Sequence, residues 1–173
     1  MAVSVSGNIQ LLAQIIDART SVVGAANEQG SRIISISNGL GIVTGTAAGQ
    51  MDKVWSDTRT VLTTATDSID LAGTLTDSFG AVVTFLKLRA ILAVAALTNT
   101  TTLQCARPAA NGCTLFGAAS GSLAPVSFGG VLIYWADPQA GQPVAAGTTD
   151  LINIINGAGA SAVYTIAILG TSA

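Results

Sequence analysis

Histidine is absent from this chain of 173 residues, and only two cysteines are present. Histidine is the usual general base and the commonest transition-metal ligand, so its absence excludes a Ser–His catalytic triad. Two cysteines without histidine also exclude a zinc site with four Cys and His ligands. Any remaining catalysis or metal binding would depend on carboxylates.

The carboxylates do not form a recognisable site. Between residues 52 and 77 they stand among turn-forming Ser, Thr and Gly, where Asp usually bonds to its own backbone; they are Asp52, Asp57, Asp67, Asp70 and Asp77. No EF-hand spacing occurs, and the glycine-rich segment 39–45 lacks the Lys of a phosphate-binding loop, so we interpret it as a turn between strands. The sequence predicts no catalytic, cofactor or metal site, and a protein that is not an enzyme.

Charged side chains are also scarce, at 9% of residues, whereas ordinary soluble domains have about a quarter. The surface must therefore consist largely of Ser, Thr, Gly and Ala. Such a surface suits burial in an assembly, because desolvating Thr or Ala costs far less than desolvating an unpaired Lys or Glu. The alternative is a weakly charged monomer. The seven basic residues are scattered, which argues against a nucleic-acid partner.

Long apolar runs suitable for a membrane are missing as well. The longest, residues 81–97, is interrupted by Lys87 and Arg89, and a spanning helix needs about 20 predominantly apolar residues. The first twelve residues carry no basic group ahead of their apolar positions, unlike a secretory signal. We expect no membrane partner and a protein made in the cytoplasm of its host.

The two cysteines leave their redox state open. Cys105 and Cys113 flank the turn-prone pair Asn111-Gly112, so a hairpin could bring them within bonding reach. Two reduced thiols in the core are the equal alternative.

Strand signals dominate what is present. Apolar residues alternate from 82 to 94 and place Lys87 and Arg89 on the opposite face of a long strand. Further runs rich in β-branched and aromatic residues, each bounded by turn residues, lie at 101–105, 131–135, 151–155 and 163–169. The segment NGAGAS between the last two predicts a hairpin.

These signals predict an all-β fold, a β-sandwich or jelly-roll-like domain with an extended N-terminal arm. We place the arm and the first strands in residues 1–50, with a strand at 32–37, and the sandwich in residues 51–173; the two could also form one continuous domain. Three aromatic residues are candidates for exposed contacts: Trp55, Tyr134 and Trp135. The alternative, which we favour, is core packing, with Trp135 at the end of the core and Tyr134 reaching a polar rim.

Two segments carry a resemblance to a known family. They are MDKVWSDTRTVLTTATDSIDLAGTLTDSFGAVVTFLKLRAILAV (51–94) and DLINIINGAGASAVYTIAILGTSA (150–173). An acidic Leu-Ala-Gly segment, a turn, a strand with basic residues and a final hairpin ending in Ile-x-Ile-x-Gly-Thr resemble small structural proteins of tailed bacteriophage virions.

The resemblance implies a virion component without catalytic residues. The short single domain of this chain favours a capsid decoration (cement) protein among virion components. Such a protein would form a homo-oligomer, preferably a trimer, and bridge subunits of the major capsid protein. The alternative is a tail or head-spike adhesin that binds host glycans through exposed aromatic side chains.

Overall fold

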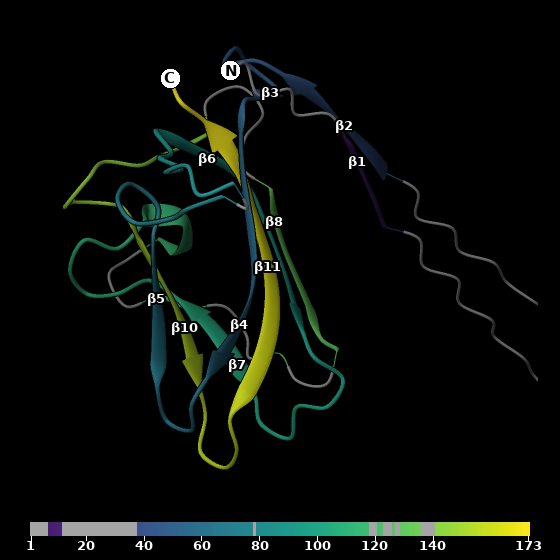
Figure 1. The fold of residues 1–173 in the computed structure, drawn as a ribbon, viewed down its shortest axis with the longest axis vertical. Coiled ribbons are helices and arrows are strands. Elements are labelled where there is room, and N and C mark those ends of the chain that lie inside the picture. Colours follow the sequence, from purple (N-terminus) through teal and green to yellow (C-terminus); the bar gives the residue numbers. More distant parts are fainter. Residues whose placement is uncertain are drawn as a thin grey trace, which may run out of the picture. The chain divides into compact units, whose positions relative to one another are not determined.

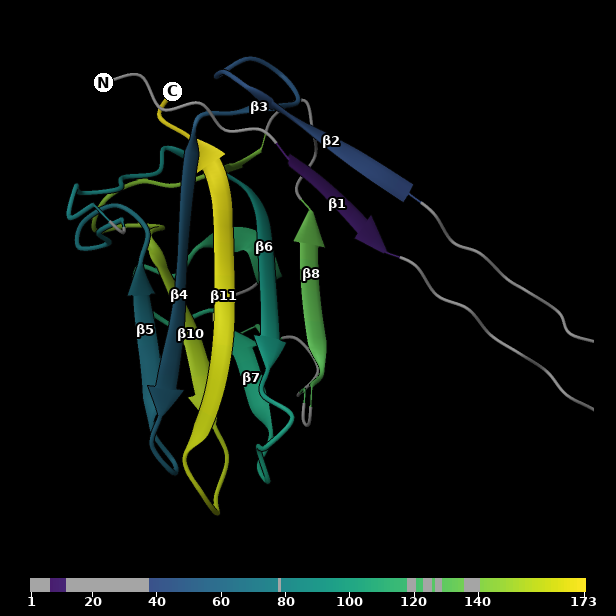
Figure 2. The same cartoon turned by 45° about the vertical axis from the view of Figure 1, so that its right-hand side comes forward.

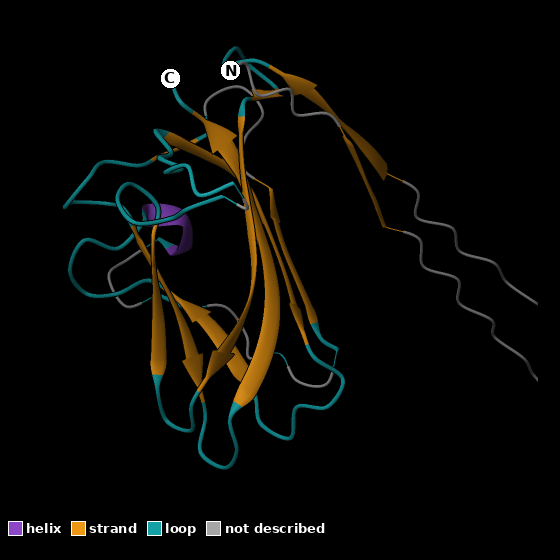
Figure 3. Cartoon of the chain, in the orientation of Figure 1, coloured by secondary structure: helices purple, strands orange, loops and turns teal. Residues whose placement is uncertain are grey.

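A computed structural model describes most of the chain, namely residues 7–11, 38–77, 79–117, 121–122, 126, 129–135 and 141–173. Strands dominate these residues, and the only helix among them is the short 3-10 turn η1 (Thr114–Phe116) (Figure 3). The predicted all-β fold is therefore confirmed. The chain forms two compact units, a smaller one at Ser6–Ile42 and a larger one that includes Val43–Ala173.

Two antiparallel sheets pack against each other in the larger unit (Figures 1 and 2). Sheet I has the strand order β4-β11-β6-β8, and β9 continues along β6 beyond β8. Its strands are β4 (Lys53–Val61), β6 (Lys87–Ala95), β8 (Val131–Trp135), β9 (Gln142–Pro143) and β11 (Ala162–Thr171).

Sheet II has the order β5-β10-β7, with β5 (Thr66–Asp70), β10 (Leu151–Asn156) and β7 (Leu103–Ala106). Isolated antiparallel bridges pair Ser122 and Val126 with β7 at the edge of this sheet. Every strand pair within the two sheets is antiparallel.

The connections identify the sandwich as a jelly roll. The chain runs from β4 to β5, β6 and β7, then through the bridged residues Ser122 and Val126 to β8, β10 and β11. Numbered in that sequence, with these two bridged residues in the fifth place, the elements lie in the spatial orders 1-8-3-6 and 2-7-4-5. Two interleaved Greek keys of this kind define the eight-stranded jelly roll.

Alternating apolar residues fill the space between the sheets. On β11, Tyr164, Ile166 and Ile168 are buried, and they face Ile152 and Ile154 of β10 across the interior. Burying one such aliphatic side chain stabilises the fold by about 1.5–3 kcal/mol. The core therefore gives β10 and β11 a fixed inward face and, as a consequence, a fixed outward face.

The strand predicted over residues 82–94 begins later, and its faces differ from those predicted. It starts at Lys87, and opposite Leu169 the pairing skips one residue of β6, which is a β-bulge. Beyond the bulge the buried residues are Ile91, Ala93 and Ala95, and the outward-facing ones are Leu92 and Val94. One inserted residue exchanges the two faces of a strand, which is why simple alternation gave the wrong assignment.

The predicted hairpin around NGAGAS is also wrong, although both strands exist. β10 and β11 flank the loop at 157–161, but β10 pairs with β5 and β7 whereas β11 pairs with β4 and β6. The loop crosses from one sheet to the other, because both strands are apolar on one side and bury that side in the same core.

The smaller unit contains an antiparallel hairpin of β1 (Gly7–Leu11) and the first five residues of β2 (Asn38–Thr44), paired from Gly7 with Ile42 to Leu11 with Asn38. The segment 39–45, interpreted above as a turn, is therefore largely a strand. The end of β2 pairs in parallel with β3 (Gln50–Met51). The strand predicted at 32–37 lies outside the described residues.

One buried amide ties together the loops at one end of the sandwich. Asn156, at the end of β10, donates from Nδ2 to the carbonyl oxygens of Val61, Leu62 and Ala160 at 2.9–3.0 Å. Its Oδ1 accepts a hydrogen bond from the Thr101 hydroxyl at 2.8 Å. Three loops of the jelly roll thus share one side chain that is 2% exposed.

Candidate assembly surface

The outward face of sheet I carries two rows of uncharged side chains that run across its four long strands. In register, the rows are Ser56–Ala167–Leu92–Ile133 and Thr58–Thr165–Val94–Val131. We call these residues the uncharged face. Its half over β6 and β8 is aliphatic, and its half over β4 and β11 is mainly hydroxyl-bearing.

The aliphatic half is open to the outside. Val131 is 55% exposed, Val94 43% and Ile133 40%, and these three side chains are neighbours across β6 and β8. The next outward positions along the strands, Val54, Thr60 and Val163, are uncharged as well. A contiguous exposed apolar patch on a sheet is a common mark of a contact surface.

The edge of sheet I at β8 has the same character. Natural edge strands usually carry Lys, Pro or a bulge that prevents pairing with another chain, but β8 reads VLIYW. Among the described residues, no strand pairs with β8 on the side away from β6. The uncharged face therefore extends to an edge without the usual protection against association.

A second exposed apolar group stands on the loop between β5 and β6. The carboxylate of Asp77 accepts the backbone N–H groups of Phe79 at 2.9 Å and Ala81 at 2.8 Å, and Thr76 bridges to Val82. This tight turn fixes the backbone while Phe79 remains 86% exposed.

An ion-pair network links β4 and β5, the adjacent edges of the two sheets. Arg59 donates two hydrogen bonds to the carboxylate of Asp67, at 2.5 and 2.7 Å, and Tyr164 donates to the same group at 2.7 Å. Burial opposes ionisation of Asp67, but the bonds from Arg59 and Tyr164 outweigh it and lower the pKa of the carboxyl. Burial and the bond to Asp67 raise the pKa of Tyr164, so the phenol stays protonated.

Two surface grooves, of about 390 and 130 Å³, both include Asp57 and Arg59 in their linings. Arg59 is already committed to Asp67 and, at 3.3 Å, to Asp57. Within the described ranges, no group of three or more His, Cys, Asp or Glu side chains is placed to hold a metal ion. We interpret the ion-pair network of Arg59, Asp67 and Tyr164 as a structural link between the two sheets.

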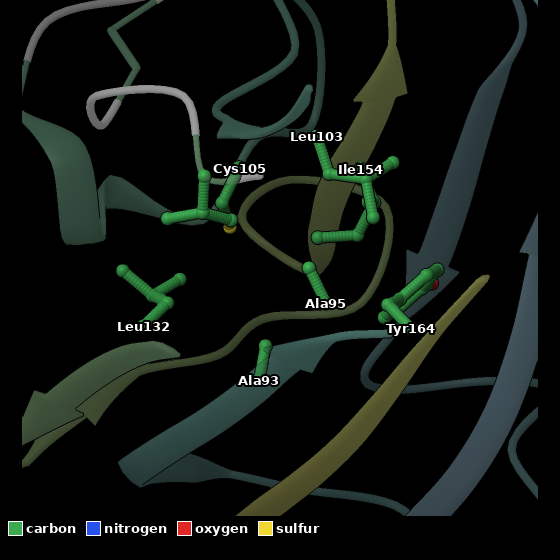
Figure 4. A pocket seen from close by; sticks show the side chains of 8 residues that line it. Ala93, Ala95, Leu103, Cys105, Leu132, Ile154 and Tyr164 are labelled. Atoms are coloured by element: carbon green, nitrogen blue, oxygen red, sulfur yellow. The ribbon is translucent and has the colours of Figure 1, made fainter. Parts of the chain in front are cut away.

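A small apolar cavity lies between the two sheets (Figure 4). It measures about 20 Å³, room for about one water molecule, and is lined by Ala93, Ala95, Leu103, Cys105, Val126, Leu132, Ile154 and Tyr164. A void of this size and polarity is a packing gap between the sheets, too small for an organic ligand.

Trp55, one of the three candidates for an exposed aromatic contact, is buried. Its side chain is 4% exposed and its indole N–H donates to the carbonyl of Thr76 at 3.1 Å, because position 55 falls on the inward face of β4. Tyr134 also points inward and is half-buried against the core. Trp135 ends β8, and its side chain lies outside the described part of the structure.

The candidate disulfide residues are both buried free thiols. Cys105 lies on β7, and Cys113 directly precedes η1. Burial raises the pKa of Cys105 to about 12 and also raises that of Cys113, so both thiols are protonated at neutral pH.

The sequence alone did not reveal the uncharged face. The alternation Ser56-x-Thr58-x-Thr60 was a usable signal for one strand, but the rows depend on register between strands far apart in the chain. Because of the bulge in β6, Leu92 and Val94 face outward, whereas simple alternation predicted them on the apolar face.

Fold and surface together define the class as an all-β jelly-roll domain with an uncharged face. No protein-family model matches this chain, and no curated protein matches it either. In the part of the chain that the structure describes, no helix is long and apolar enough to cross a lipid bilayer.

Proposed function

We propose that this chain is a non-enzymatic structural protein of a tailed bacteriophage virion, a decoration protein that oligomerises and stabilises the shell of the major capsid protein. The observation that carries the proposal is the uncharged face. It places exposed aliphatic side chains on a rigid sheet, where a contact can bury them without desolvating a charge.

The hairpin of β1 and β2 supports the same proposal. It has five cross-strand pairs and belongs to a unit separate from the jelly-roll core. A two-stranded hairpin is marginally stable on its own in water. Contact with a neighbouring protein would stabilise it, as expected for an arm that reaches along a shell.

Stabilisation would follow from mass action. A protein that binds only the assembled shell shifts the equilibrium toward assembly, and many weak contacts add up over a lattice. The tail or spike adhesin depended on exposed aromatic residues, and burial of Trp55 removes one of its candidate platforms.

Empty shells of the phage that encodes this chain, assembled without it, provide the test. Purified protein added to these shells should bind saturably and raise their melting temperature in differential scanning calorimetry. Absence of binding at about 100 µM protein would reject a shell-stabilising role, because even contacts in the weak range would be populated there.

A further inference from the structure

We infer that the uncharged face is where two copies of this chain bind each other, face to face across a two-fold axis. The inference rests on the proposed function as an assembling protein and names the partner at this surface as a second copy.

The first argument is electrostatic. A face that meets its own copy brings every charge on it close to an identical charge, and opposed like charges cost several kcal/mol. The two rows of the uncharged face contain no Asp, Glu, Lys or Arg. The neighbouring outward residues Val54, Thr60 and Val163 are uncharged as well. The two rows themselves therefore add no like-charge repulsion to a self-contact.

The second argument is the division of the face into two halves. A two-fold axis that lies in the contact plane and runs across the strands places β8 opposite β8 and β4 opposite β4. Aliphatic side chains around Val94 and Val131 then meet their own kind, and hydroxyl groups meet hydroxyl groups. These hydroxyls can serve as mutual partners, since Thr58 and Thr165 already share a hydrogen bond of 2.9 Å within one face.

The third argument is area. Ser56 to Thr60 extends about 14 Å, and four strands are about 19 Å wide, so the flat area is about 270 Å². The row beside Val54 adds little, because Leu169 and Ala90 in register with it are buried. Side-chain relief raises the accessible area above this figure, toward but below the roughly 800 Å² per partner of a standard interface. This predicts a weak dimer with a dissociation constant in the micromolar range.

The same geometry favours a pair over the trimer expected from the sequence. In an isologous contact the same surface of both copies is buried, so no free surface of this kind remains for a third copy. Sheets that pack in this way lie about 10 Å apart with their strands about 30° from parallel.

Analytical ultracentrifugation of the full chain from about 1 µM to about 1 mM tests the inference. The parent should sediment at twice the 17.2 kDa chain mass at the upper end of this range. Val94→Lys and Val131→Lys each place two ammonium groups in one contact and should raise the dissociation constant at least about 100-fold. Phe79→Lys, with the same charge change at an 86% exposed site off the sheet, is the matched control and should dimerise like the parent.

Circular dichroism melts confirm that each variant is folded. A parent that stays monomeric at about 1 mM overturns the inference, as does a dimer that both face variants leave intact or that Phe79→Lys dissociates equally. If a face variant no longer dimerises but still binds shells, the decoration role does not depend on the two-fold contact. Conversely, dimers that never bind shells would reject that role and keep the two-fold contact.

Discussion

Replacing Asn156 with alanine should destabilise the jelly roll more than any loss of a surface contact. The amide has four hydrogen-bond partners, Val61, Leu62, Ala160 and Thr101, and because Nδ2 carries only two hydrogens, one N–H is shared between two of the three carbonyls. An unshared hydrogen bond is worth about 1 kcal/mol net, and each buried group left without a partner costs about 1–3 kcal/mol. Because water can reach part of the vacated site, we expect a total loss of about 3–5 kcal/mol.

Urea unfolding followed by tryptophan fluorescence measures this loss. The midpoint should fall with the slope unchanged, since the unfolded surface is the same. Asn153→Ala is the matched control: it lies on the same strand, and its side chain accepts one exposed hydrogen bond from Ser68, so it should cost about 0.5 kcal/mol. A loss below about 1 kcal/mol for Asn156→Ala would refute the view that this amide fastens the three loops.

Three further outcomes follow from the structure. Asp67→Asn should lower the free energy of unfolding by about 1–2 kcal/mol at pH 7. Because the folded pKa of Asp67 lies below its unfolded value, the stability difference between parent and variant should vanish as pH falls through the folded pKa. A pH-independent difference in urea melts would contradict this. Gly170→Ala should lower stability by about 1–3 kcal/mol, because the added Cβ would lie 2.2 Å from the Lys87 carbonyl oxygen. Gly157→Ala is the control: the nearest atom to its added Cβ lies 3.5 Å away, so it should be near neutral in the same melts. Cys105 and Cys113 should react with a thiol reagent only after unfolding, and finding no reactive thiols in unfolded, unreduced protein would show a disulfide instead.

Much of the sandwich could be predicted because its strands are short and bounded by turn residues. The run at 131–135 coincides with β8, and the run at 151–155 falls short of β10 by one residue. In each case β-branched residues lie between a glycine or aspartate and the next turn, so local chemistry was sufficient.

What could not be predicted depends on pairing between distant residues. Nothing local marks the bulge in β6, which exists because its partner β11 shifts register at Leu169 and Gly170. Likewise, the loop after Asn156 looks like a hairpin turn, and only the shared core shows that its strands belong to different sheets. The burial of Trp55 follows from the same cause, because the inward face of an edge strand is set by the opposite layer.

Imaging of the intact phage particle tests the central claim most directly. Virions of the phage that encodes this chain, labelled with gold-tagged antibody against it and viewed by electron microscopy, should carry label over the whole shell. Label confined to the tail or to a single vertex, or particles without label, would contradict a decoration protein.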